Sequence, residues 1–221
     1  MTRKLENVRL NIRNAASTAG RAADDITLIA VSKTKSSGAI ASILDQGQRV
    51  FGENKIQEAA EKWPALRERY DNVELHLIGP LQSNKVRLAI QTFDVIETVD
   101  RVKLARAIAR INAEEHKNIQ CYIQVNVGRE EQKSGVDPDE ADDFITLCRD
   151  DLKLSLQGLM CIPPAGKDPK VYFALLKEIA ARNGLDKLSM GMSHDYQDAI
   201  HAGATSVRVG TAIFGPRDYA I

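Results

Sequence analysis

The stretch ITLIAVSKTK, residues 26–35, has the pattern of a buried β-strand that ends abruptly in polar and charged residues. Its first six residues are apolar or β-branched, as is typical of strands. Residues two apart in a strand share a face, so Ile29, Val31 and Lys33 are expected to point the same way. An ammonium group at the mouth of an apolar strand is costly unless it reaches solvent, a counter-charge or a reaction partner. Lys33 is therefore the first candidate for a functional residue.

Short apolar runs like this one alternate with helical patterns from one end of the chain to the other. Strands are predicted at residues 26–33, 49–53, 74–79, 95–99, 119–127, 154–161, 187–193 and 206–214. Helices are predicted before the first strand, at residues 2–19, and between later strands at residues 39–46, 55–69, 101–116, 138–149 and 169–183. This alternation predicts an α/β fold.

Eight strands joined by helices predict a parallel sheet, and closing that sheet gives a (β/α)8 TIM barrel with an extra N-terminal helix. The chain has 221 residues, near the lower end for this fold, so a single domain over residues 1–221 is expected. The alternative is an open doubly wound sheet. However, no G-x-G-x-x-G or Walker-A loop follows any strand, so the usual nucleotide-binding signature is missing.

The composition excludes several classes of partner. Basic and acidic residues balance at 30 each, so no net positive charge attracts nucleic acid or an anionic membrane surface. The three cysteines have no C-x-x-C spacing, which favours a reduced, cytoplasmic protein. The first six residues are mostly charged or polar and lack the apolar core of a signal peptide, and no apolar run is long enough to span a bilayer, so a soluble protein is expected. His194 and His201 do not form part of a metal-binding pattern, so no metal is expected.

A second lysine strengthens the candidacy of Lys33. In barrels of this kind, binding and chemistry take place at the C-terminal ends of the strands. Lys35 lies on the same face as Lys33, and a nearby positive charge favours the neutral, nucleophilic form of an amine. The pair suits an imine-forming lysine, although two solvated lysines closing a strand would have the same pattern.

The ends of the seventh and eighth predicted strands are rich in small residues. Gly191, Ser193, Gly210 and Thr211 supply backbone N–H groups and hydroxyls where barrels often bind phosphate. Gly210 also lets the backbone approach a ligand closely. The alternative is that glycine and serine simply terminate these strands. The coincidence of both turns at the expected position favours a phosphate site.

Arg208 shares a face with Gly210 and is expected to point into the barrel, where it needs an acceptor. Either a ring nitrogen of a ligand or a salt bridge to Glu53 or Glu97 would satisfy it. An imine-forming lysine, a phosphate site and an inward arginine together match pyridoxal 5′-phosphate (PLP), which carries an aldehyde, a phosphate and a ring nitrogen.

Seven stretches of the chain resemble motifs of one family, in the order that the family has them. They are AVSKTK (30–35), FGEN (51–54), HLIGPLQSNK (76–85), QKSG (132–135), GLM (158–160), SMGMS (189–193) and VRVGTAIFGPRDY (207–219). On these residues the sequence closely resembles the pyridoxal phosphate homeostasis proteins, single-domain relatives of the N-terminal barrel of alanine racemase. The resemblance spans nearly the whole chain.

The resemblance implies specific roles for six residues in binding PLP. Lys33 would form the covalent aldimine and Asn54 would lie near the cofactor. Arg208 would approach the pyridine nitrogen. The phosphate would be bound by Ser193, Gly210 and Thr211. Lys35, Lys133 and His76 also fall in family motifs, but the resemblance assigns them no definite role, and Ser36 replaces a proline that is common in the family.

The residues favour a binding protein over an enzyme, so no catalytic residue is assigned. A charged arginine beside the ring nitrogen weakens PLP as an electron sink. The second base of the two-domain racemases comes from a domain that this chain is expected to lack. The prediction is reversible PLP binding that regulates its supply, with a monomer favoured and any recipient apo-enzymes unidentified. The alternatives are a PLP-dependent amino-acid racemase and a cofactor-free Schiff-base aldolase.

Overall fold

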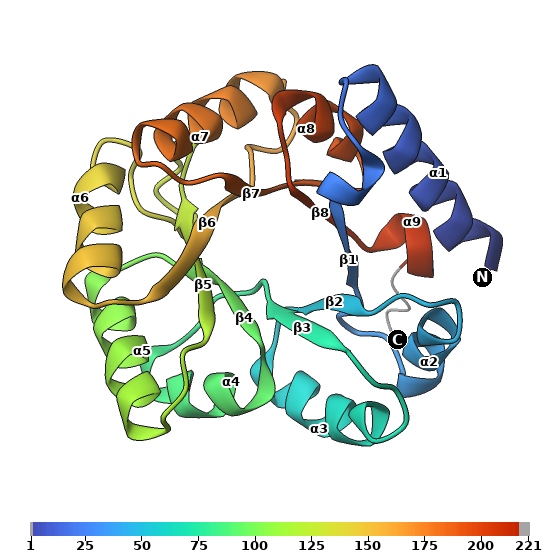
Figure 1. Cartoon of the computed structure of the whole chain (residues 1–221), viewed down its shortest axis with the longest axis horizontal. Coiled ribbons are helices and arrows are strands. Elements are labelled where there is room, and N and C mark those ends of the chain that lie inside the picture. Colours follow the sequence, from blue (N-terminus) through green and yellow to red (C-terminus); the bar gives the residue numbers. More distant parts are fainter. Residues whose placement is uncertain (1, 217–221) are drawn as a thin grey trace.

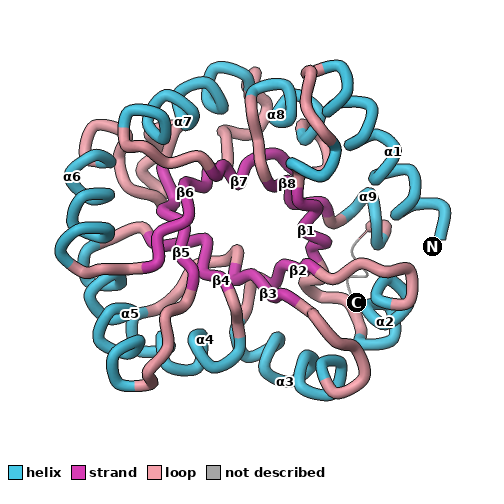
Figure 2. The backbone as a smooth tube through the Cα atoms, in the orientation of Figure 1, coloured by secondary structure: helices cyan, strands magenta, loops and turns pink. Residues whose placement is uncertain are grey.

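The computed structural model describes residues 2–216, and it confirms the predicted (β/α)8 barrel. Eight parallel strands pair in chain order, and β8 pairs with β1 to close the barrel. Figures 1 and 2 show the ring of strands at the centre and the helices around it. The strands are β1 (Thr27–Val31), β2 (Val50–Glu53), β3 (Glu74–Leu77), β4 (Val95–Val99), β5 (Gln120–Val125), β6 (Ser155–Cys161), β7 (Lys187–Met192) and β8 (Ser206–Val209).

The helices alternate with these strands, although no helix range was predicted for α4, α8 or α9. They are α1 (Thr2–Thr18), α2 (Ser37–Leu44), α3 (Ile56–Arg67), α4 (Val86–Thr92), α5 (Val102–Glu114), α6 (Ala141–Thr146), α7 (Lys170–Arg182), α8 (Tyr196–Ala202) and α9 (Thr211–Phe214). Short 3-10 turns occupy residues 23–25 and 83–85, and a π-helical turn follows α6 at residues 147–151.

The extra N-terminal helix, α1, packs on the outside of the barrel against α8 and α9 (Figure 1). Its apolar face is buried, since Leu5 and Ala16 are completely inaccessible to solvent. The side-chain amide of Asn11 on this helix donates to the hydroxyl of Tyr196 at 3.2 Å. The N-terminal helix is therefore an integral part of the packed structure.

Most of the apolar core lies between the outer faces of the strands and the surrounding helices. The inside of the barrel is different. A small separate cluster of Val95, Tyr122 and Met160 fills part of it, and buried charged groups share the remaining interior. This charged interior is described below with the site.

Five predicted strands, those that became β1, β3, β5, β7 and β8, extend too far at their C-terminal ends, and the eighth and the first show why. The eighth was predicted to reach Phe214, but β8 ends at Val209 and the chain turns into α9. The backbone N–H of Phe214 donates to the carbonyl of Gly210 at 2.9 Å, a helical bond that a strand cannot make. The first strand was predicted to include Lys33, but β1 ends at Val31. Here the N–H of Lys35 donates to the carbonyl of Ser32 at 3.0 Å and closes a turn.

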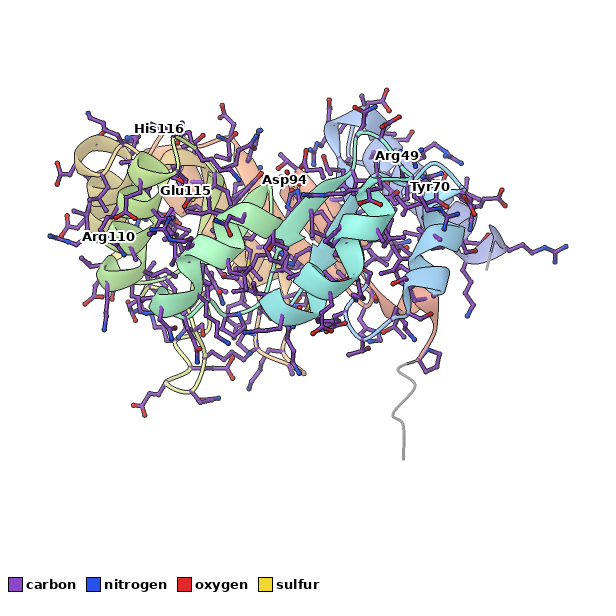
Figure 3. All side chains as sticks on the ribbon, turned by 90° about the horizontal axis from the view of Figure 1, so that it is seen from below. Arg49, Tyr70, Asp94, Arg110, Glu115 and His116 are labelled. Carbon is purple, nitrogen blue, oxygen red and sulfur yellow. The ribbon has the colours of Figure 1, made fainter. Side chains whose placement is uncertain are left out.

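Figure 3 turns the barrel on its side and distinguishes its two ends. The labelled Arg49 and Asp94, which precede β2 and β4, and His116, which precedes β5, lie along one edge of the molecule. This edge is the N-terminal end of the barrel. The C-terminal ends of the strands therefore open at the opposite edge. Within residues 2–216, no helix is long and apolar enough to cross a lipid bilayer.

Candidate functional site

The loops after β1 and β8 lie side by side at the C-terminal mouth of the barrel. Ala30 of β1 pairs with Val209 of β8, so the two strands end at the same level. A methyl group added at Gly210 would lie 3.3 Å from the side chain and the carbonyl of Val31. Lys33 follows two residues after Val31 and is half-buried. Closure of the barrel therefore brings the loop of Lys33 close to Gly210, two candidate binding residues that are 177 positions apart in the sequence (210 − 33).

The two predicted phosphate turns also meet. The backbone N–H of Gly210 donates to the hydroxyl of Ser193 at 3.3 Å, and Thr211 begins α9 immediately after. Gly191, near the end of β7, has a φ of +91°, and a Cβ there would lie 2.5 Å from the side chain of Ala199, so this end of the strand requires glycine. Small polar groups from both turns thus face one another at the mouth.

Asn54 follows β2, one strand further round the barrel from Lys33. It is half-buried and lines a cavity of about 350 Å³ with Lys55, Pro80, Gln82 and Lys85, among others. Gly79, two residues after the neighbouring β3, packs directly on the backbone of Asn54, because a Cβ at Gly79 would lie 2.2 Å from the carbonyl oxygen of Asn54. Asn54 therefore lies at the mouth of the barrel.

Arg208 lies deeper, inside the barrel, with 4% of its surface exposed. Nη1 of its guanidinium donates to the hydroxyl of Ser189 at 2.7 Å, and Nη2 donates to the carbonyl of Cys161 at 2.7 Å. The nearest carboxylate is Glu97, whose Oε2 lies 3.8 Å from Nη1. The salt bridge that the sequence left open is therefore present with Glu97. Glu53 faces the outside of the barrel and does not pair with Arg208.

A chain of buried polar groups connects Arg208 to the other end of the barrel. Glu97 accepts a hydrogen bond from Ser189 at 2.7 Å through one oxygen and contacts His76 Nδ1 at 2.7 Å through the other. His76 Nε2 contacts Glu74 at 2.7 Å. His76 also lines a cavity of about 610 Å³ at the N-terminal end. His76 is thus an interior residue and not a mouth residue.

The charges of this chain are set by their mutual contacts. Burial alone would lower the pKa of His76, but hydrogen bonds with Glu74 and Glu97 outweigh it and raise the pKa to about 9. Burial would raise the pKa of Glu97, yet His76 and the charge of Arg208 hold that pKa below its ordinary value. At neutral pH the barrel interior therefore contains a protonated His76 between carboxylates, and an arginine held by one of them.

Two other lysines of the sequence motifs, Lys35 and Lys133, contact neighbouring loops. The ammonium of Lys35 donates to the carbonyl of Pro216 at 2.7 Å. The ammonium of Lys133 donates to the carbonyl of Pro163 at 3.3 Å and lies 2.5 Å from the carboxylate of Glu130. These contacts give both lysines a role in holding loops around the mouth.

Sequence reasoning missed the residues that hold the loop of Lys33 from behind. Lys62 and Glu58 on α3, together with Glu53, contact the backbone or side chains of residues 32–35. The spacing of Glu58 and Lys62, four residues apart on a helix, predicts an ion pair between them. It does not indicate that the pair reaches a loop more than 20 residues earlier.

The arrangement can bind an anion beside an amine. The loop that carries Lys33 lies beside a turn with the hydroxyl of Ser193 and the backbone N–H of Gly210, and Arg208 is held deeper in the barrel. Within residues 2–216, no group of three or more histidine, cysteine, aspartate and glutamate side chains has the geometry of a metal site. The chemistry that the site offers is that of lysine, hydroxyl, backbone N–H and guanidinium groups.

Comparison with known proteins places this barrel in a defined class. The family model described as alanine racemase, N-terminal domain, matches residues 4–218. An alanine racemase from Clostridium difficile superposes with a TM-score of 0.72 at 17% identity, over 97% of this chain and 57% of the racemase. At this identity the likeness concerns the fold. The class is therefore that of the alanine racemase N-terminal barrels.

Nearer relatives define the family within that class. The pyridoxal phosphate homeostasis protein of Escherichia coli K12 is 42% identical over 225 residues, covering 98% of this chain and 96% of that protein. PipY of Synechococcus elongatus is 34% identical. Its structure without PLP superposes with a TM-score of 0.86 over 97% of this chain, and its structure with PLP bound superposes with a TM-score of 0.80 over 93%. The chain belongs to the pyridoxal phosphate homeostasis protein family.

Proposed function

We propose that this protein binds pyridoxal 5′-phosphate reversibly at the C-terminal mouth of the barrel and regulates its supply in the cell. The observation that carries the proposal is the convergence of Lys33, Ser193 and Gly210 at one place on the closed barrel. The names of the relatives and the PLP-bound structure of PipY support it.

The residues at the mouth fit the parts of PLP. The amine of Lys33 would hold the cofactor covalently through its aldehyde. The phosphate would lie against Ser193, Gly210 and Thr211, because the absent side chain of Gly210 leaves its backbone open beside Val31. Asn54 would flank the cofactor from β2.

Arg208 would lie below the pyridine nitrogen. The hydrogen bonds to Ser189 and Cys161 use two of the five N–H donors of its guanidinium, so the group has further donors to offer. Bound PLP supplies an electron sink, and it does so best when its ring nitrogen carries a proton. A permanently charged arginine cannot accept that proton or share it, which favours binding without turnover.

Trapping the cofactor with borohydride tests the proposal. The purified protein is incubated with PLP, reduced, digested and mapped by mass spectrometry. We expect one pyridoxyl-modified lysine, Lys33, and a visible absorbance band that the Lys33→Ala variant lacks. The variant should still fold, because Lys33 is half-buried at the mouth and not part of the core.

A matched control is Lys103→Ala, which removes an exposed lysine from α5 and should leave the band unchanged. An unmodified parent protein would overturn the cofactor assignment. A Lys33→Ala variant with the parent's absorbance would overturn the assignment of Lys33 alone.

A further inference from the structure

One cluster of charged side chains forms hydrogen bonds to the loop that carries Lys33, from the outer side of the barrel. Lys62 of α3 has 12% of its side chain exposed, and its ammonium lies 2.8 Å from Glu53 and 2.8 Å from Glu58. The same ammonium donates to the carbonyl of Ser32 at 3.4 Å and to the carbonyl of Lys35 at 3.3 Å. One cation therefore bridges the residues on either side of the Lys33–Thr34 turn.

The two carboxylates of this cluster accept hydrogen bonds from other atoms of the same loop. Glu53, which is completely buried, accepts from the hydroxyl of Ser32 at 2.7 Å and from the indole N–H of Trp63 at 3.3 Å. Glu58 accepts from the backbone N–H of Thr34 at 2.6 Å. Burial raises the pKa of Glu53, so this carboxylate depends on the ammonium of Lys62 to remain ionised.

The backbone of the loop that these three side chains contact has an unfavourable conformation. Thr34 has a φ of +63°, in the left-handed region that β-branched residues rarely adopt. Such a conformation persists only where the surroundings over-determine it. The bond from Thr34 to Glu58 and the two bonds from Lys62 supply that constraint. A relaxed loop would place the Cα of Lys33, and with it the amine, differently.

We propose that Lys62, with Glu53 and Glu58, is a positioning cluster that holds Lys33 in the orientation needed to bind the aldehyde of PLP. This inference rests on the proposed function and concerns how firmly the same site holds the cofactor. Holding a binding group in its bound conformation raises affinity, because less freedom is lost on binding. The cluster touches the loop of Lys33 from outside the barrel, so it acts through the backbone and not by contact with the ligand.

Two variants separate positioning from stability. Lys62→Met leaves Glu53 buried without its cation, so it should weaken both the fold and PLP binding. The double variant Lys62→Met/Glu53→Gln removes both charges, so it should regain most of the melting temperature. It still lacks the bonds to the carbonyls of Ser32 and Lys35. Lys103→Met, an exposed lysine on α5, is the matched control.

The first readout needs no cofactor. Amide hydrogen exchange of the peptide spanning residues 31–36 is measured on the parent and on the variants in the absence of PLP. We expect faster exchange in the double variant than in the parent or in Lys103→Met, because the loop has lost two of its fixed contacts. Equal protection in the parent and the double variant would overturn the inference, whatever the protein does with PLP.

The second readout is PLP release. Each protein is loaded with PLP and diluted, and the loss of visible absorbance is followed. We expect PLP release from the double variant to be about tenfold faster than from the parent. The reason is that the double variant has lost charge-assisted hydrogen bonds that pre-organise the binding group. Unchanged release from a double variant with a faster-exchanging loop would overturn the positioning role. A parent that never acquires the band would instead contradict the proposed function.

Discussion

At the scale of single residues, the barrel interior depends on His76 being charged. Its imidazole lies between Glu74 and Glu97, and Glu97 in turn pairs with Arg208. A neutral His76 would donate through one ring nitrogen only and would leave one carboxylate without its hydrogen bond. The protonation of this histidine therefore stabilises the network that holds Arg208 below the mouth.

The raised pKa of His76 predicts a stability that falls in alkaline solution. A histidine whose pKa is about 9 in the folded protein and 6.5 when unfolded stabilises the fold fully below pH 6.5. That contribution is lost as the pH rises through 9. We expect the free energy of unfolding to fall by roughly 1–3 kcal/mol more in the parent than in His76→Gln between pH 6.5 and 9.5.

Urea unfolding at these two pH values measures the difference. His116→Gln, which changes an exposed histidine, serves as the control and should follow the parent. The quantity to compare is the change in the free energy of unfolding between the two pH values. The absolute stability is not informative, because replacing a buried histidine also changes packing. If the parent and His76→Gln lose stability equally over this range, His76 is not the titrating group.

At the scale of elements, α1 completes the outer wall of the barrel beside β8 and β1. It packs on α8 and α9, the two helices that flank the turns with Ser193 and Gly210 (Figure 1). The short α9 begins directly at the predicted phosphate turn. The N-terminal helix therefore supports the candidate site by packing behind α8 and α9, and it contributes no candidate binding residue.

Two leucines of α1 offer a matched test of this packing. Leu5 is completely buried, whereas Leu10 has 47% of its surface exposed. We expect Leu5→Ala to lower the free energy of unfolding by about 2–5 kcal/mol, because it leaves a cavity in the core. Leu10→Ala should change it by less than about 0.5 kcal/mol, the range of ordinary surface substitutions. Chemical denaturation of both variants measures these effects, and similar losses in both would contradict the role assigned to α1.

At the scale of the whole molecule, the closed barrel turns separate sequence motifs into one site. Only the pairing of β8 with β1 places the loop of Lys33 beside Gly210. The same closure encloses the His76 network, whose members come from β3, β4, β7 and β8. The proposed site at the mouth and the charged interior therefore both depend on the complete ring.

Absence of turnover is a further expectation for the whole protein. With PLP bound and alanine present in deuterated water, we expect no exchange of the alanine α-hydrogen beyond that caused by free PLP, because Arg208 in its proposed place beside the ring nitrogen would weaken the electron sink. Proton NMR of the amino acid measures the exchange, with PLP alone as the control. Sustained exchange that disappears in Lys33→Ala would instead establish a racemase-like activity.

The sequence by itself determined the order and kind of most elements, because strand and helix periodicity is local. It also predicted six binding residues. Five of them lie at the expected ends of strands, which a barrel brings to one face, whereas Asn54 and the specific role of each residue come from the resemblance to the family. The ends of β1 and β8 were extended too far, since the turn at Ser32–Lys35 and the helical bond to Gly210 are not visible in apolar patterning.

Only the tertiary structure decided what surrounds those candidates. It placed His76 between two carboxylates in the interior, directed Glu53 outward to Lys62, and paired Arg208 with Glu97. The physical reason is that a buried charge takes the partner that the fold brings within hydrogen-bonding distance, and residue spacing along the chain does not encode that distance. The pattern of the sequence thus specified the barrel and its mouth, while the folded ring selected the contacts that hold the site in place.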